Sequence, residues 1–162
     1  MPANKVLESL DINSTAFFGR SLERFQDLAL RQTESVFKRA GIVVPSRSCS
    51  LLLAIRAHGP VSASDLSDIL GYSHQRVLQK IPKLHKLGLI DTRQDANDAR
   101  RRLFELTKQG EQQAQLLEKV LPAFATAYRK LFEEVGDIDQ VISDAISAIT
   151  NYPLDERIQL PK

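Results

Sequence analysis

The sequence has very little cysteine and no long apolar run. One cysteine among 162 residues excludes an intramolecular disulfide framework. Every apolar stretch is shorter than the roughly 20 residues that a helix needs to cross a bilayer. The first twelve residues also lack the apolar segment and the cleavage site of a signal peptide. We therefore expect a cytoplasmic protein without a membrane segment.

Motifs of known catalytic chemistry are absent as well. The sequence has no glycine-rich phosphate loop, no Gly-x-Ser-x-Gly, no His-Glu-x-x-His and no convincing pair of carboxylates. Its three histidines lack companion cysteines or carboxylates at the spacing of metal ligands, which favours the absence of a metal site. We predict that the protein is not an enzyme and needs no cofactor.

Positive charge is concentrated in one part of an otherwise ordinary composition. With 43% hydrophobic and 26% charged residues, the chain is typical of a globular domain with its own core. Its net charge is only +2, yet Ser73 to Arg102 carries eight Lys or Arg against three Asp, a local balance of +5. Such a concentration is the electrostatic footprint of a phosphate-binding surface.

Capping and breaking residues over 45–106 predict a definite order of elements. A helix begins near Pro45 and ends before Gly59, and Val61 makes a minimal strand. Ser62 caps a short helix, and after a tight turn Ser73 caps the next one. Two β-rich segments, 89–94 and 101–107, then flank the polar run 95–99 and form a hairpin. This order predicts a mainly α fold with a small β-hairpin, the winged helix-turn-helix.

The helix after Ser73 has two distinct faces. At 100° per residue, Val77, Ile81 and Leu84 share an apolar stripe, and basic and amide side chains share another. Such a helix can anchor in a core and still present donors to base edges in a major groove. A solvated charged face is the other interpretation of the stripe, although the adjacent basic hairpin favours DNA. The predicted DNA-binding residues of this helix are Ser73, His74, Gln75, Arg76, Gln79, Lys80 and Lys83. Pro82 predicts a kink that would displace Lys83 from the stripe.

The hairpin tip adds Arg100, Arg101 and Arg102 to the predicted DNA contacts. Side chains on a strand alternate in direction, so the three cannot all face DNA, and Arg100 lies nearest the tip. Asp98 either holds Arg100 through an ion pair or serves as a turn residue through its own backbone hydrogen bonds.

Long amphipathic helices are predicted over 13–41 and 107–151, on either side of this module. Their apolar faces exceed what a small winged helix could cover, so we predict a homodimer interface there. Packing within the chain's own domain is the alternative for the first helix. Pro122 predicts an interruption of the second helical region, and 152–162 is predicted to be a tail. We treat 1–162 as a single domain containing the DNA-binding module 45–106.

A family resemblance rests on residues 51 to 117. Asp95 to Arg102, followed by Leu106-Thr107-x-x-Gly110, is similar to the Asp-x-x-Asp-x-Arg and Leu-Thr-x-x-Gly signature of the multiple-antibiotic-resistance regulator (MarR) family. This resemblance implies a bacterial homodimeric transcription factor whose wing arginine, here Arg100, enters a minor groove. It also implies a repressor of palindromic operators, relieved by a small molecule or by oxidation.

Two features bear on that regulation. A groove between the segments 13–30 and 45–58 is predicted to bind a small aromatic effector, and a packed groove without a ligand is the alternative. We expect Phe17, Arg20, Arg47 and His58 to line it. Cys49 lies on a short core helix, which favours an inert thiol over an oxidant sensor. The competing function is a winged-helix protein-interaction or architectural DNA-binding module without effector control.

Overall fold

The computed structural model describes residues 14–98 and 100–160. Two compact units make up the chain, Met1–Leu117 and Glu118–Lys162, and the boundary between them falls within the helix α6 (Lys108–Val135). Asn13, the first residue of the predicted helix 13–41, and the hairpin residue Ala99 lie outside the described residues.

The first unit begins with the 3₁₀ turn η1 (Thr15–Phe17) and the long helix α2 (Phe18–Ala40). α2 ends at Gly41, whose φ of 70° is the left-handed conformation that glycine adopts without strain. Lys38 and Arg39 in its last turn complement the negative end of the helix dipole. Only Phe37 of this helix is buried, so most of its apolar stripe remains exposed.

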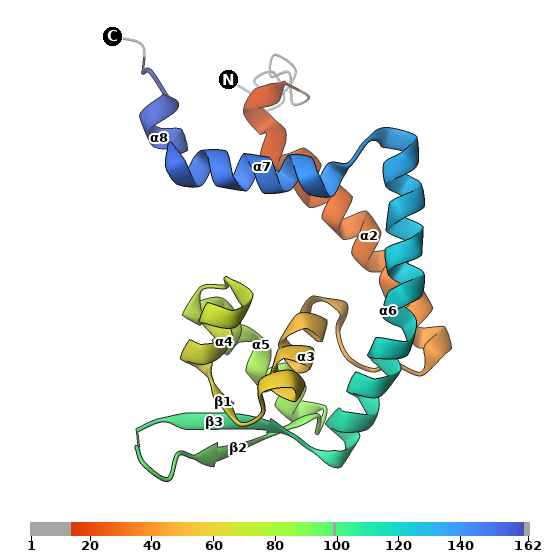
Figure 1. The fold of residues 1–162 in the computed structure, drawn as a ribbon, viewed down its shortest axis with the longest axis vertical. Coiled ribbons are helices and arrows are strands. Elements are labelled where there is room, and N and C mark those ends of the chain that lie inside the picture. Colours follow the sequence, from red (N-terminus) through yellow and green to blue (C-terminus); the bar gives the residue numbers. More distant parts are fainter. Residues whose placement is uncertain (1–13, 99, 161–162) are drawn as a thin grey trace, which may run out of the picture. The chain divides into compact units, whose positions relative to one another are not determined.

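Three short helices and a small sheet form the core of the first unit (Figure 1). The 3₁₀ turn η2 (Ser46–Ser48) leads into α3 (Cys49–His58), which is followed by β1 (Val61–Ser62), α4 (Ala63–Leu70) and α5 (His74–Lys86). Figure 1 shows these helices on one side of the sheet. The largest fully buried side chains come from the three helices, from β2 and from the segments beside them: Val44, Leu51, Leu52, Ile55, Leu66, Val77, Leu84, Leu89, Ile90 and Leu117.

The sheet has three antiparallel strands in the order β1-β3-β2. β2 (Ile90–Gln94) and β3 (Arg102–Leu106) form the hairpin, with Thr92 opposite Phe104. Val61 of β1 also pairs with Phe104, whose ring is buried against the core. The predicted fold class is confirmed: the chain is mainly helical, and its small sheet completes a winged helix-turn-helix.

The junction between the wing and α6 explains the Leu-Thr-x-x-Gly pattern. The hydroxyl of Thr107 donates to the carbonyl of Gly88 and accepts from the N–H of Gly110, at 2.6 and 3.0 Å. The N–H of Thr107 donates to the carbonyl of Leu89 at 3.1 Å. A Cβ at position 110 would overlap that Leu89 carbonyl, so only glycine allows this close approach.

The described elements of the second unit are helices: the end of α6, α7 (Ile138–Asn151) and α8 (Leu154–Arg157). The predicted interruption at Pro122 is wrong, because α6 continues through this residue to Val135. One missing N–H removes a single hydrogen bond, and the rest of a 28-residue helix compensates. Gly136 ends the helix with a φ of 96°, and Asp137 caps α7. The short helix α8 lies inside the segment that we predicted to be a tail.

Candidate nucleic-acid interface

The recognition helix α5 is fixed by caps at its start and by three buried side chains along its length. Gly71 ends α4 in the left-handed conformation, with a φ of 62°, and Ser73 accepts a hydrogen bond from the N–H of Arg76 at 3.2 Å. Val77, Ile81 and Leu84 are buried, as the periodicity predicted. The opposite side of the helix is exposed and carries His74, Gln75, Arg76, Gln79 and Lys83.

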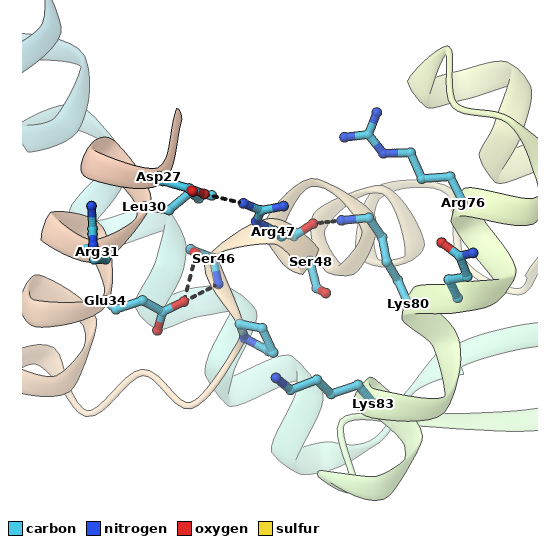
Figure 2. A pocket seen from close by; sticks show the side chains of 12 residues that line it. Asp27, Leu30, Arg31, Glu34, Ser46, Arg47, Ser48, Arg76, Lys80 and Lys83 are labelled. Carbon is cyan, nitrogen blue, oxygen red and sulfur yellow. Dashed lines mark hydrogen bonds and ion pairs between the residues drawn. The ribbon is translucent and has the colours of Figure 1, made fainter. Parts of the chain in front are cut away.

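Pro82 does not divide the recognition helix. α5 runs without a break from His74 to Lys86, and Figure 2 shows Arg76, Lys80 and Lys83 on the same side of it. All three line one groove with Gln79, so Lys83 stays with the basic stripe despite the proline. The predicted displacement of Lys83 is therefore wrong.

Lys80 is half-buried and already has a partner inside the protein. Its ammonium group donates to the backbone carbonyl of Arg47, which lies in η2. Burial lowers the pKa of Lys80, and the nearby charges of Arg76 and Arg47 lower it further. The sequence predicted this residue as a DNA contact, but its position assigns it to the packing of the recognition helix against η2.

Tyr72, an aromatic residue that was not predicted to belong to the site, lies beside the basic stripe of α5. The guanidinium carbon of Arg76 lies 4.5 Å from the ring centre of Tyr72, and the Nζ atom of Lys80 lies 5.7 Å from it. The Tyr72 hydroxyl is 3.1 Å from the hydroxyl of Ser50 in α3. The signal in the sequence was the spacing: Arg76 and Lys80 lie one turn apart on one face of the helix, and Tyr72 precedes the helix, four residues before Arg76.

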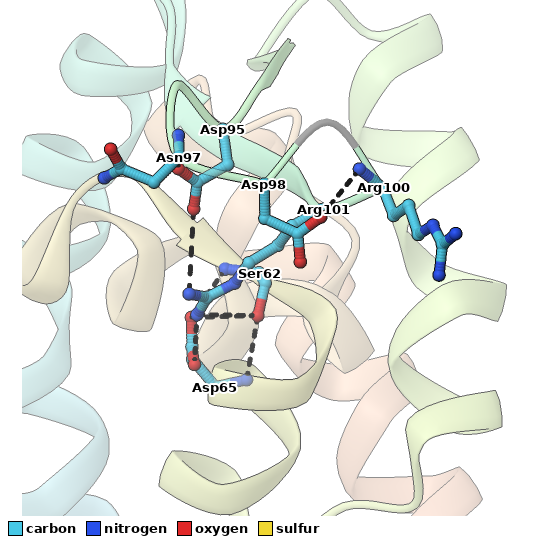
Figure 3. Close-up of polar contacts among 7 residues, drawn as sticks. All are labelled: Ser62, Asp65, Asp95, Asn97, Asp98, Arg100 and Arg101. Carbon is cyan, nitrogen blue, oxygen red and sulfur yellow. Dashed lines mark hydrogen bonds and ion pairs between the residues drawn. The ribbon is translucent and has the colours of Figure 1, made fainter.

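The wing tip is shaped by two aspartates that bind backbone N–H groups. Asp95 accepts from the N–H of Asn97 and Asp98 accepts from the N–H of Arg100, both at 2.9 Å. This is the ordinary turn role of aspartate, and it accounts for Asp98 without an ion pair to the Arg100 side chain. The side chain of Arg100 is exposed and points away from the acidic cluster (Figure 3).

Arg101 points the other way and holds the wing to α4. Its guanidinium lies 2.6 and 2.7 Å from the two carboxylate oxygens of Asp65, 3.3 Å from the Ser62 hydroxyl and 3.7 Å from the Asp95 carboxylate (Figure 3). Ser62 and Asp65 themselves form the capping box of α4. The hydrogen bonds from Ser62 and the Arg101 guanidinium keep the pKa of Asp65 below its usual range. Arg101 was predicted to contact DNA, but its side chain is engaged in this network.

Recognition helix and wing together line a groove of about 610 Å³. His74, Leu78 and Pro82 contribute from α5, and Arg100 and Arg102 contribute from the wing. Both arginines are exposed, and Arg102 begins β3 opposite Gln94. His74, Leu78 and Pro82 of α5 and the two wing arginines therefore line the same groove.

A second groove, of about 620 Å³, lies between α2, η2 and the recognition helix (Figure 2). It contains Arg47 and other residues that were not predicted to bind an effector. Phe17, Arg20 and His58 are not among its lining residues, so only Arg47 of the four predicted effector residues lies in it. The twelve lining residues are Asp27, Leu30, Arg31, Glu34, Pro45, Ser46, Arg47, Ser48, Arg76, Gln79, Lys80 and Lys83.

The two acids in this groove are already paired. Asp27 lies 2.8 Å from the Arg47 guanidinium, and Glu34 accepts from the N–H and the hydroxyl of Ser46 at 3.0 and 2.7 Å. These hydrogen bonds hold the pKa of Glu34 below its usual range. Five Lys or Arg against two carboxylates leave the groove with a net positive charge.

Cys49 has the environment of an inert thiol. Burial raises its pKa to about 12, and the charge of Glu34 also raises it. The Sγ atom lies 3.6 Å from the carbonyl oxygen of Pro45. Reactive thiols have a lowered pKa and lie in exposed electropositive surroundings, so this position favours the inert interpretation.

Within 14–98 and 100–160, no three His, Cys, Asp or Glu residues are grouped so that they could hold a metal ion. In the same part of the chain, no helix combines the length and the apolar composition that crossing a membrane requires.

The module described above also matches a known protein family. Residues 44–101 fit the model of the MarR family, which covers the helices α3 to α5 and most of the wing. This module is MarR-like. The resemblance that the wing signature indicated is thereby confirmed. No curated protein matches the chain.

Several solved structures share the fold. The PcaV transcriptional regulator from Streptomyces coelicolor, in complex with its natural ligand, is 19% identical with a TM-score of 0.61, over 89% of this chain and 97% of that one. A MarR transcriptional regulator from Methanosarcina mazei is 19% identical with a TM-score of 0.56, over 87% and 99%. The adhesin competence repressor AdcR from Streptococcus pyogenes is 19% identical with a TM-score of 0.56, over 84% and 96%. At these identities the likeness concerns the fold alone.

Proposed function

We propose that this MarR-like protein is a transcription regulator that binds double-stranded DNA in a sequence-specific manner. The observation that carries the proposal is the surface shared by the recognition helix and the wing. His74 and Leu78 on one side and Arg100 and Arg102 on the other line the same groove. A helix with exposed amide and basic side chains suits a major groove, and an arginine on a projecting hairpin suits the adjacent minor groove.

We assign to DNA the exposed residues of the recognition helix and of the wing. The exposed residues His74, Gln75, Arg76, Gln79 and Lys83 are proposed to contact bases or phosphates, and Arg100 and Arg102 are proposed to contact the neighbouring groove or backbone. Ser73, Lys80 and Arg101 are instead proposed to support this surface, because each is engaged in a hydrogen bond or ion pair to the protein.

We further propose a homodimer that represses from palindromic operators. Large apolar side chains are exposed on α2, including Phe18 at 58% and Leu22 at 40%. Val141 at 65% and Ile146 at 57% are exposed on α7. A second copy would cover these faces, and its two-fold axis would set two recognition helices about 34 Å apart on one face of the duplex. AdcR, one of the proteins that shares this fold, is a repressor. A regulator of this kind acts where the chromosome is, so we also propose a cytoplasmic location.

The basic groove around Arg47 is the proposed effector site. Its net positive charge suits a small aromatic carboxylate, and PcaV was solved with its natural ligand. A ligand relieves repression only if it binds the DNA-free state more tightly than the DNA-bound state. Titration calorimetry with benzoate and salicylate, with and without operator DNA, tests this. Equal affinity in both cases would contradict the coupling.

Selection of bound duplexes from a random DNA library tests the proposed function directly. We expect a palindromic sequence to be enriched, and Arg100→Ala to weaken binding to it by up to a few kcal/mol while the fold stays intact. The competing function, an architectural or protein-binding module without effector control, predicts no enriched sequence and an unaltered affinity in Arg100→Ala.

A further inference from the structure

We propose that Tyr72 is a positioning residue for DNA recognition, which orients Arg76 before DNA arrives. This inference rests on the proposed DNA binding, and it assigns a role to a residue of the turn rather than of the recognition helix. Tyr72 lies in the short connection between α4 and α5, where it is half-buried. It would act through Arg76, because its own hydroxyl is engaged with Ser50.

The ring of Tyr72 is held at both ends. Its backbone N–H donates to the carbonyl of Ser67 at 3.1 Å, which fixes the start of the side chain to the end of α4. Its hydroxyl is 3.1 Å from the Ser50 hydroxyl, which fixes the far end to α3. The long axis of the ring is therefore fixed by two elements of the core and not by the recognition helix itself.

Two cations of the recognition helix lie at this ring. The Arg76 guanidinium carbon is 4.5 Å from the ring centre and the Lys80 ammonium is 5.7 Å from it. An aromatic face attracts cations through its quadrupole. The Lys80 ammonium is also bound by the Arg47 carbonyl, so that charge is committed to the protein. The Arg76 side chain is exposed. Its N–H groups lie in the guanidinium plane, so a guanidinium over the ring face can still donate to an acceptor on DNA.

Preorganisation is the physical gain. An unrestrained arginine loses rotamer freedom when it binds DNA, and this loss weakens affinity. An arginine that already lies on a fixed ring loses less. Removal of the ring therefore weakens DNA binding only while Arg76 is present, whereas a general packing defect would weaken it in either case.

A double-mutant cycle tests the inference on the full chain. The probes are a duplex recovered by selection and a scrambled duplex of the same composition. The single variants are Tyr72→Leu, Tyr72→Phe and Arg76→Ala, and the double variant combines Tyr72→Leu with Arg76→Ala. We expect Tyr72→Leu to lower affinity for the selected duplex by about two- to five-fold, the range for a ring–guanidinium contact at an exposed site. Tyr72→Phe keeps the ring and should retain most of the affinity. In the Arg76→Ala background, Tyr72→Leu should have no effect.

A matched control and a spectroscopic readout separate positioning from packing. Tyr152 carries the same kind of contact in the second unit, with Arg157 at 4.6 Å, so Tyr152→Leu should leave DNA affinity unchanged. The Nε–H resonance of Arg76 should show a ring-current shift that Tyr72→Leu removes and Tyr72→Phe keeps.

Three results would overturn the inference. An equal loss in both Arg76 backgrounds would mean that Tyr72 acts through packing. A gain in affinity from Tyr72→Leu would mean that the contact must break for DNA to bind. If the unmodified protein binds no duplex, both the proposed function and this inference are wrong. If it binds DNA but the cycle shows no coupling between Tyr72 and Arg76, only the role of Tyr72 is wrong.

Discussion

Neighbouring side chains of the same type have different roles in this protein. Arg100 and Arg101 are adjacent, yet one is exposed at the tip and the other is bound by Asp65. The sequence predicted that the arginines alternate in direction, and it could not show which of them finds a carboxylate. That partner lies 36 residues away, in the capping box of α4.

Arg101→Ala should therefore destabilise the fold by about 0.5–1.5 kcal/mol at neutral pH, because it removes charge-assisted hydrogen bonds at a half-exposed site. The pKa of Asp65 is lowered in the folded protein. The ionised carboxylate therefore stabilises the fold at pH values above the usual carboxylate pKa, and this stabilisation is lost as pH falls through the lowered pKa. Urea unfolding at pH 7 and pH 3 measures both effects. If Arg101→Ala lowers the free energy of unfolding by the same amount at both pH values, the ion pair is not the cause of the loss.

Cys49 should be unreactive while the protein is folded. With its pKa raised to about 12, the thiolate fraction at pH 8 is very small, and burial limits access to the sulfur. Iodoacetamide at pH 8 should leave Cys49 unmodified in buffer and alkylate it in 6 M guanidinium chloride. Native modification at the rate of a free thiol would support an oxidant sensor instead.

At the scale of elements, the sequence predicted most of the winged module because its signals are local. Ser62 and Ser73 cap the helices they were expected to cap, and Gly41 and Gly71 end helices in the left-handed conformation. Two predictions based on proline were wrong: the displacement of Lys83 from the stripe by Pro82, and the interruption of the second helical region at Pro122. Intrinsic propensity describes an isolated helix, whereas packing and the remaining hydrogen bonds carry a helix through one missing donor.

The groove residues could not be predicted with the same success. Arg31, Glu34, Lys83 and Arg47 meet in one groove although they come from three segments. Local pattern indicates which face of each segment is polar, but it does not show how the segments cross. Tyr72 was missed for a related reason, since its partner Ser50 lies 22 residues earlier.

Gly110→Ala should disconnect the wing from α6. An added methyl group would overlap the Leu89 carbonyl, which accepts the N–H of Thr107, so backbone has to move. We expect a loss of about 1–3 kcal/mol or more in the free energy of unfolding, measured with urea. Gly19→Ala in α2 is the matched control, because a Cβ there meets nothing within 4 Å and should be neutral or slightly stabilising. Equal stability of the two variants would contradict the close contact at Gly110.

At the scale of the whole molecule, exposed apolar surface predicts self-association. Large apolar side chains are exposed on the amphipathic helices α2 and α7. Light scattering should give twice the monomer mass of 18.2 kDa at micromolar concentration. Phe18→Glu together with Phe25→Glu should shift this mass toward the monomer, because buried charges at an apolar interface are unfavourable. A monomeric mass for the unmodified protein would contradict the proposed dimer.

Charge distribution and fold together make DNA binding the central claim, and its salt dependence is the most direct test. Fluorescence anisotropy with the selected duplex and with a scrambled duplex should show tight, preferential binding to the first. The logarithm of the association constant should fall linearly with the logarithm of salt concentration, because lysine and arginine contacts release counterions. Lys83→Ala should reduce the magnitude of that slope by about one if Lys83 contacts a phosphate. Equal affinity for both duplexes, or no duplex binding at low salt, would contradict the account.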